Sequence, residues 1–251
     1  MEISPFTHTH LTDSCNSAIL AALILVDKKK VLIAEEGGWY SHKEYPKLLG
    51  MQVVTIKCDW GKLDMDDLKE HADSDSVLLY STLGAYAVEQ PMAEINAIMK
   101  NANGKIIGDI SGSIGFPGLA TEWFDYAVCS FGDHKPLQVG FGGMLCSNHI
   151  LEGPAITFGR FPEKFREEIN EAYKKLPFRM RFYQEEREKI LKEIKAEVAH
   201  PAIRGINLLV KGQPTEVLQY LRKNQIPYLL TPRYHRVKQK GISIEIKRMV
   251  P

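Results

Sequence analysis

Short apolar runs alternate with longer stretches of helical periodicity through the first 150 residues of the chain. The apolar runs predict strands at residues 31–34, 52–56, 77–81, 105–109, 124–130 and 143–147. The stretches between them predict helices near residues 17–26, 41–49, 64–72 and 92–102. Strands that alternate with helices favour an α/β fold with a doubly wound, mostly parallel sheet.

From about residue 160 the sequence becomes rich in lysine, glutamate and arginine. Residues 163–175 and 183–198 have the pattern of two charged helices, with a proline between them. Four shorter segments then predict a small α/β unit, at residues 206–210, 215–223, 228–231 and 242–246. We therefore predict a large domain over residues 1–160, followed over residues 161–251 by a helical connection and a small C-terminal α/β domain.

The composition excludes some classes of partner. The 32 basic and 31 acidic side chains give a formal charge of +1, so no electrostatic attraction to nucleic acid or to an anionic membrane is expected. The longest apolar run, at residues 18–26, is too short to span a bilayer, and no signal peptide opens the chain, which favours a cytoplasmic protein. The four cysteines have no metal-ligand spacing, and no metal site is predicted.

The most informative segment is residues 129–144, Cys-Ser-Phe-Gly-Asp-His-Lys-Pro-Leu-Gln-Val-Gly-Phe-Gly-Gly-Met. Lys135 follows a predicted strand, lies five residues after Ser130, and precedes a Gly-x-Gly-Gly turn that lets the backbone approach a bulky ligand. A lysine forms an imine only when it is held in place in a site that lowers its pKa. We interpret Lys135 as the Schiff-base lysine of a pyridoxal 5′-phosphate (PLP) enzyme, with the Ser130 hydroxyl on the phosphate. A solvated loop lysine is the alternative.

Asp109 ends the predicted strand at residues 105–109. Open α/β sheets bind ligands in the crevice at the carboxyl ends of their strands. A carboxylate in that position can pair with the pyridinium nitrogen of PLP and keep the ring protonated. An Asx turn after a strand is the other use of such a residue.

Two further segments suit the same cofactor. Asn16 and Ser17 lie at the start of an apolar helix, where free N–H groups and the helix dipole favour a phosphate, although plain helix capping needs no ligand. Trp39 follows the strand at residues 31–34 and is placed to stack on the pyridine ring, with Tyr40 as its substitute. Packing in the core is the alternative for the tryptophan.

In this order, the segments resemble the DegT/StrS-type sugar aminotransferases, PLP enzymes of the aspartate-aminotransferase fold. Residues 14–19 resemble the family's Ser-Cys-Thr-Ala-Ala-Leu. Residues 130–144 resemble Phe-Ser-Phe-x-x-x-Lys-x-Leu-x-x-Gly-Glu-Gly-Gly-Met, with Phe141 in place of the glutamate. The resemblance covers roughly residues 9–147. It implies transfer of an amino group from an amino acid to a keto sugar nucleotide or a related small ketone.

The chain departs from the family pattern at several points. Gly112 stands where the family usually has a Gln or His near the phenolic oxygen of the cofactor. Pro177 replaces the Asn that reaches the phosphate in the neighbouring subunit, and the chain begins close to the phosphate segment. These departures leave open a catalytically silent PLP-fold regulatory or partner subunit. His134, directly before the lysine as in decarboxylase-like relatives, leaves open a PLP-dependent lyase or decarboxylase.

The resemblance also implies that the active site lies between two domains and at a dimer interface, so a homodimer is expected. Arg179 is a candidate for binding a substrate carboxylate or phosphate, followed by Arg204 and Arg233, because a planar guanidinium matches such anions. A surface ion pair is the alternative role for each arginine. His134 is the second candidate for contact with substrate.

Overall fold

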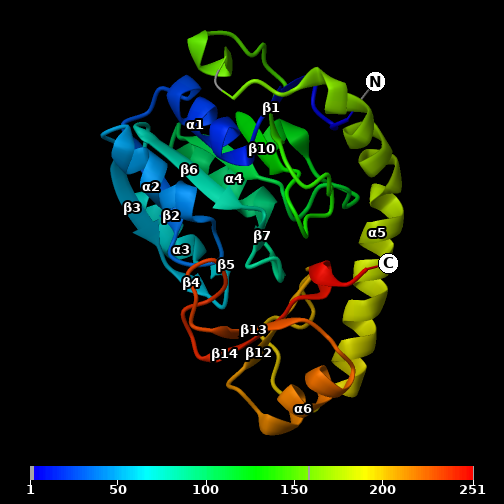
Figure 1. The fold of residues 1–251 in the computed structure, drawn as a ribbon. Coiled ribbons are helices and arrows are strands. Elements are labelled where there is room, and N and C mark those ends of the chain that lie inside the picture. The colour runs from blue at the N-terminus through cyan, green and yellow to red at the C-terminus, as the bar shows by residue number, and fades with distance from the viewer. Residues whose placement is uncertain (1–2, 158, 251) are drawn as a thin grey trace.

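The computed structural model describes residues 3–157 and 159–250. Seven strands form its main sheet: β1 (His8–Thr12), β2 (Lys30–Ala34), β3 (Gln52–Ile56), β6 (Ser76–Ser81), β9 (Lys105–Asp109), β10 (Tyr126–Ser130) and β11 (Gly143–Ser147). Their order is β1-β11-β10-β9-β6-β2-β3 (Figure 1). The strands from β10 to β3 are parallel, and β11 is antiparallel to both of its neighbours. The predicted α/β fold with a mostly parallel sheet is confirmed.

Helices cover both faces of this sheet. α1 (Cys15–Leu25) and α2 (Tyr40–Leu48) contact each other, as do α3 (Met65–His71) and α4 (Met92–Asn101). Successive residues of a strand point to opposite faces. Val31 of β2 accordingly packs in one apolar cluster with α1, and Leu32 packs with α3 and α4 in the other. Burial on both faces explains why the sequence shows continuous apolar runs.

Strand β1 was not predicted, because its sequence His-Thr-His-Leu-Thr is mostly polar. It pairs antiparallel with β11, which is itself antiparallel to β10, so β1 and β10 point the same way. Thr12 and Ser130 both pair with Gly143. The chain therefore enters α1 at the same edge of the sheet at which β9 and β10 end.

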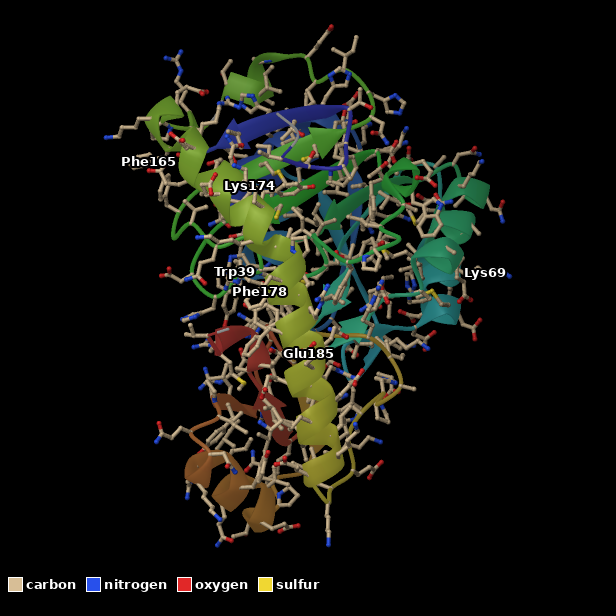
Figure 2. The ribbon with its side chains drawn as sticks, turned by 90° about the vertical axis from the view of Figure 1, so that its right-hand side faces the viewer. Trp39, Lys69, Phe165, Lys174, Phe178 and Glu185 are labelled. Atoms are coloured by element: carbon tan, nitrogen blue, oxygen red, sulfur yellow. The ribbon has the colours of Figure 1, made fainter. Side chains whose placement is uncertain are left out.

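The two charged helices predicted after residue 160 are one helix, α5 (Arg166–Glu193), which continues through Pro177. Tertiary packing overrides the helix-breaking tendency of proline. Leu176 is buried against Gly115, where an added Cβ would lie 2.6 Å from Leu176 Cγ. Figure 2 shows α5 running alongside both the main sheet and the C-terminal unit.

The C-terminal unit contains a second sheet, which is antiparallel and has the order β12-β14-β13. Its elements are β12 (Leu208–Lys211), α6 (Thr215–Lys223), β13 (Tyr228–Thr231) and β14 (Gly241–Ile244), close to the segments predicted for this unit. The domain boundary at residue 160 stays a prediction. Among the described residues, no helix has both the length and the apolar character needed to cross a bilayer.

Short elements complete the structure, and most of them lie in connections that the sequence pattern does not mark. They are the strands β4 (Cys58–Asp59), β5 (Lys62–Leu63), β7 (Leu83–Gly84) and β8 (Val88–Glu89), and the 3-10 helices η1 (Thr121–Trp123), η2 (Pro154–Thr157), η3 (Glu163–Phe165) and η4 (Ile246–Arg248). The turn between β7 and β8 and the helix η4 both contribute to the site described next.

Candidate functional site

A cavity of about 500 Å³ lies at the carboxyl ends of β9 and β10, between the main sheet and the C-terminal unit. Its wall contains most of the residues selected from the sequence: Asn16, Trp39, Asp109, Ser130, His134 and Lys135. The C-terminal unit adds His235, Arg236, Lys247 and Arg248. Ser17 and Arg179 are not part of this wall.

Lys135 lies in the cavity with its amine beside two aromatic rings. The Lys135 Nζ donates a hydrogen bond to the Tyr86 hydroxyl and lies 5.7 Å from the centroid of the Trp39 ring. Burial lowers the pKa of this amine, but the Tyr86 oxygen and the Asp109 carboxylate outweigh burial and raise the pKa above its ordinary value. The prediction that the site lowers the pKa of Lys135 is therefore wrong for the ligand-free protein.

Asp109 is held at the end of β9 by two neighbours. Its Oδ1 accepts a hydrogen bond of 3.0 Å from the Ser111 N–H, and its Oδ2 lies 3.3 Å from His42 Nε2 of α2. Burial raises the pKa of the carboxyl, but His42, Ser111 and Lys135 together lower it below its usual value. The buried Asp109 is thus a carboxylate, and His42 is a site residue to which the sequence assigned no role.

At the start of α1, the hydrogen-bond donors of Ser17 are bonded to neighbouring side chains. The Ser17 N–H donates to the Ser14 Oγ at 3.2 Å, and the Ser17 hydroxyl donates to Asp13 Oδ1 at 2.5 Å. Both donors of Ser17 are engaged, so its predicted contact with a phosphate is not supported. Asn16, one residue earlier, lies on the cavity wall.

Ser130 lies on the cavity wall at the end of β10. Its N–H donates to the Ser111 Oγ at 2.9 Å, and its own Oγ accepts from the Gly132 N–H at 3.3 Å. These bonds fix the strand end and leave the hydroxyl proton of Ser130 available to an anion.

Trp39 lies at the mouth of the cavity, immediately before α2. Its side chain is 43% exposed, which excludes the alternative that it packs in the core. The ring meets Tyr40 edge-on at 5.5 Å and His235 at 6.3 Å between centroids. These three residues form an aromatic rim between the main sheet and the C-terminal unit. Stacking of Trp39 on a cofactor ring stays a prediction.

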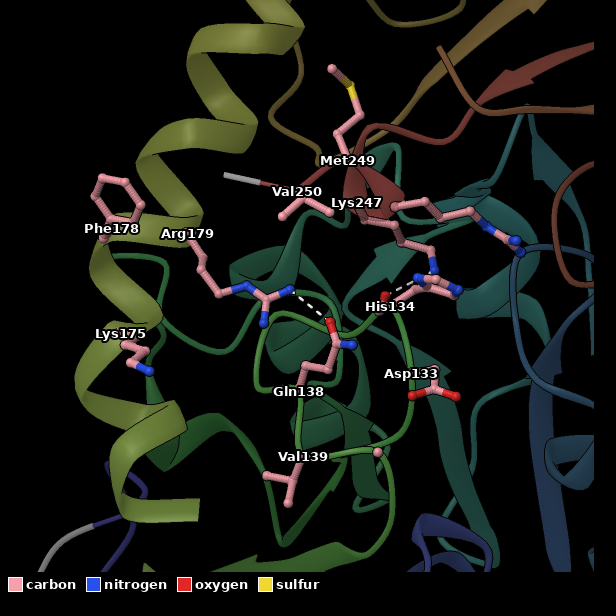
Figure 3. A pocket seen from close by; sticks show the side chains of 12 residues that line it. Asp133, His134, Gln138, Val139, Lys175, Phe178, Arg179, Lys247, Met249 and Val250 are labelled. Atoms are coloured by element: carbon pink, nitrogen blue, oxygen red, sulfur yellow. Dashed lines mark hydrogen bonds between the residues drawn. The ribbon is translucent and has the colours of Figure 1, made fainter. Parts of the chain in front are cut away.

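A second pocket, of about 610 Å³, adjoins the cavity (Figure 3). The two spaces share Asp133, His134, Lys247 and Arg248. Arg179 of α5 lines this second pocket and donates 2.9 Å hydrogen bonds to Gln138 Oε1 and to the Tyr183 hydroxyl. The buried Nε of Arg179 has no partner among the described residues. The pocket thus offers a guanidinium next to the cavity, where an anionic group of a substrate could bind.

His134 lies in the wall that separates the two pockets. Its φ of 58° places it in the left-handed region, and its carbonyl oxygen accepts a 3.0 Å hydrogen bond from Lys247 Nζ. Burial and the charges of Arg248 and Lys247 lower the pKa of the His134 ring, which is therefore neutral at physiological pH.

The other two arginines named as anion-binding candidates have structural roles. Arg204 forms a two-bond ion pair with Glu89 and lies 4.3 Å from the centroid of the Phe116 ring. Arg233 donates through its Nε to the Leu230 carbonyl at 3.2 Å. Neither residue lines the cavity or the adjoining pocket, so the structure gives no support to their prediction as substrate ligands.

Three basic residues of the cavity, Arg236, Lys247 and Arg248, were not predicted from the sequence because they lie about 100 residues after Lys135. Arg236 and Arg248 both contact the fully buried Glu245. Burial lowers the pKa of Lys247 to about 6, with Lys135 and Arg236 acting in the same direction and Glu245 opposing. Long-range packing alone brings these residues to the site, and no local sequence pattern marks them.

One family model matches part of this sequence, and several solved structures have a similar fold. The model of the MJ1341 family C-terminal domain matches residues 183–250. A DegT DnrJ EryC1 StrS aminotransferase from Brucella abortus is 15% identical, with 96% of this chain and 81% of that chain covered at a TM-score of 0.73. GDP-4-keto-6-deoxy-D-mannose-3-dehydratase of E. coli with bound hydrated PLP is 13% identical, with coverage of 96% and 84% and a TM-score of 0.72.

A NifS-like protein from Rickettsia africae is 15% identical, with 94% of this chain and 75% of that chain covered at a TM-score of 0.67. A search of the curated proteins gives no match to the sequence. At these identities the similarity concerns the fold. The fold that the resemblance implied is therefore confirmed, and the chain has the architecture of the PLP-dependent transferases.

Proposed function

We propose that the protein is a PLP-dependent aminotransferase. One observation carries the proposal: the Lys135 amine and the Asp109 carboxylate line the same cavity, at the carboxyl ends of parallel strands. The amine is needed to form an imine with the aldehyde of PLP. The carboxylate is needed to keep the pyridine nitrogen of PLP protonated. The similarity to folds such as that of a dehydratase with bound PLP supports this assignment.

The residues of the cavity fit PLP in size and in charge. The cavity volume of about 500 Å³ lies within the range of volumes of small-molecule binding sites. The start of α1 with Asn16 suits a phosphate, as does the free hydroxyl proton of Ser130. Arg236 and Arg248 add positive charge near the phosphate and carboxylate groups expected there. When bound, PLP would supply an electron sink for a carbanion at the substrate carbon.

Each protein group would then have a defined task. Asp109, kept anionic by His42, would hold the proton on the ring nitrogen. Trp39 would cover one face of the ring at the cavity mouth. Lys135 would bind the aldehyde and, once displaced by the amino donor, would carry a proton between two carbon atoms as general base and then general acid.

We further propose that the amino acceptor is a keto sugar nucleotide or a related small ketone that bears an anionic group. The basic pocket beside the cavity supports this choice, because the guanidinium of Arg179 lines it. Substrate and cofactor would meet at His134, which borders both spaces.

A half-reaction tests the aminotransferase proposal. The protein is loaded with PLP and mixed with single amino acids, and formation of the corresponding keto acids is followed by mass spectrometry. We expect one keto acid per bound cofactor, no product with Lys135→Ala, and an unchanged yield with Lys105→Ala, which removes an exposed lysine at the opposite end of β9. Equal yields from the wild type and Lys135→Ala would refute the proposal.

A catalytically silent PLP-fold subunit is the second candidate, favoured by the absence of a side chain at Gly112. It predicts that PLP binds but that no amino acid yields a keto acid. A lyase or decarboxylase, suggested by His134, would instead release labelled carbon dioxide or a shortened product from the same amino acids.

The expected homodimer and the cytoplasmic location belong to the proposal as well. A dimer predicts twice the mass of the 28.4 kDa chain by light scattering. Fractionation of source cells tests the location.

A further inference from the structure

Tyr86, which the sequence did not single out, lies on a strained turn beside the proposed reactive lysine. Ala85 and Tyr86 have φ angles of 52° and 63°, both in the left-handed region that large L-residues rarely adopt. The turn is held by the Tyr86 carbonyl oxygen, which accepts hydrogen bonds from Ile206 N–H at 2.8 Å and Asn207 N–H at 3.0 Å. Such strain persists where the surroundings enforce it, and it concentrates at functional sites.

The ring of Tyr86 is surrounded by basic side chains of the cavity wall. Its centroid lies 4.9 Å from Lys135 Nζ, 4.5 Å from Lys247 Nζ and 5.2 Å from the guanidinium carbon of Arg236. The ring attracts the charged groups of Lys135 and Arg236. At the edge of the ring, the Tyr86 hydroxyl accepts a hydrogen bond from Lys135.

The position of the ring depends on a residue elsewhere in the chain. Gly112 follows β9 by three residues, and a Cβ built there would lie 3.0 Å from Tyr86 Cδ1. Leu83 Cβ would lie 3.2 Å away, so the Tyr86 ring and the Leu83 side chain together occupy the space next to Gly112. The absence of a side chain at Gly112 thus allows the strained turn to place the Tyr86 ring in the cavity.

We propose that Tyr86 is a positioning residue for Lys135, whose hydroxyl holds the amine in the cavity and stabilises its protonated form until an aldehyde ligand takes the hydroxyl's place. This inference rests on the proposed function, because it takes Lys135 as the reactive amine. It also accounts for Gly112 without assuming that the site has lost its activity.

The test measures the Lys135 amine without any cofactor. Ligand-free protein is methylated with formaldehyde and cyanoborohydride at a series of pH values, and labelling of Lys135 is quantified by mass spectrometry. Tyr86→Phe keeps the ring and removes the hydroxyl. We expect it to label Lys135 about two- to tenfold faster at neutral pH, because the loss of one hydrogen bond increases the neutral fraction of the amine by that factor. The pH midpoint of labelling should fall accordingly.

Two variants separate positioning from a general structural effect. Tyr40→Phe removes the hydroxyl of another tyrosine in the same wall, one that bonds His235, and should leave Lys135 labelling unchanged. Gly112→Ala should push the Tyr86 ring away and change labelling in the same direction as Tyr86→Phe. Wild-type rates and midpoints in both Tyr86→Phe and Gly112→Ala would overturn the inference. Since the labelling needs no PLP, it reports on Tyr86 even if the aminotransferase proposal fails.

Discussion

Removing the negative charge of the buried Glu245 tests how much its ion pair with Arg236 contributes to folding stability. Glu245 is 0% exposed and accepts two hydrogen bonds of 2.7 Å from Arg236, which is itself 3% exposed. Ser243 donates a third bond of 2.7 Å to the same carboxylate. The substitution Glu245→Gln keeps the size of the side chain but leaves the buried Arg236 charge without its counter-ion.

Two estimates of the cost agree. Breaking a buried ion pair by removing one partner costs about 3–5 kcal/mol. Burial opposes ionisation of Glu245, yet Arg236 and its other neighbours lower its pKa from 4.5 to about 2. That shift corresponds to about 3 kcal/mol of folding free energy. Because the folded-state pKa is the lower one, this stabilisation is present above pH 4.5 and is lost as the pH falls toward 2.

Urea unfolding followed by circular dichroism measures the effect. We expect Glu245→Gln to lower the free energy of unfolding by about 3 kcal/mol at pH 7 and to weaken its dependence on pH below 4.5. Glu163→Gln, which breaks an exposed pair with Arg166, is the matched control and should leave the midpoint unchanged. A loss below about 1 kcal/mol in Glu245→Gln would contradict the reasoning.

Three shorter predictions concern the sheet and the site. Gly108→Ala places a Cβ 2.4 Å from the Phe124 ring and should cost about 1–3 kcal/mol in the same urea assay; an unchanged midpoint would refute the packing argument. Asp109→Asn should weaken PLP binding at least about tenfold in a fluorescence titration, because it removes the charge opposite the ring nitrogen, and equal affinity would argue against that role. Lys247, whose pKa is lowered to about 6, should titrate near that value when its methylated amine is followed by NMR, whereas titration above pH 9 would show that the amine is solvated.

The main sheet was predictable because burial on both faces of a strand leaves an uninterrupted apolar run. The run at residues 105–109 therefore located β9 together with its terminal carboxylate. β1 escaped prediction because it is an edge strand of mixed polarity, held by pairing with β11. The helix α5 was divided in two because Pro177 is a strong local signal, whereas the packing of Leu176 on Gly115 that maintains the helix is a contact between distant segments.

The residues of the candidate site likewise divide into those that the sequence predicted and those that it did not. Lys135, Asp109 and Ser130 follow strands directly, so the fold class was enough to bring them together at one edge. His42, Tyr86 and Lys247 come from a helix, a turn and the C-terminal unit, and nothing in their immediate sequence marks them. Gly112 carried an indirect signal, because a missing side chain in a dense site implies that another group fills the space.

We propose that Lys135 is the amine that binds the aldehyde, and reductive trapping tests this assignment directly. Purified protein is incubated with PLP, reduced with borohydride, digested and mapped by mass spectrometry. We expect one phosphopyridoxyl group per chain on Lys135, and its loss in Lys135→Ala. An adduct on Lys247, or only on exposed lysines, with Lys135 unmodified would contradict it.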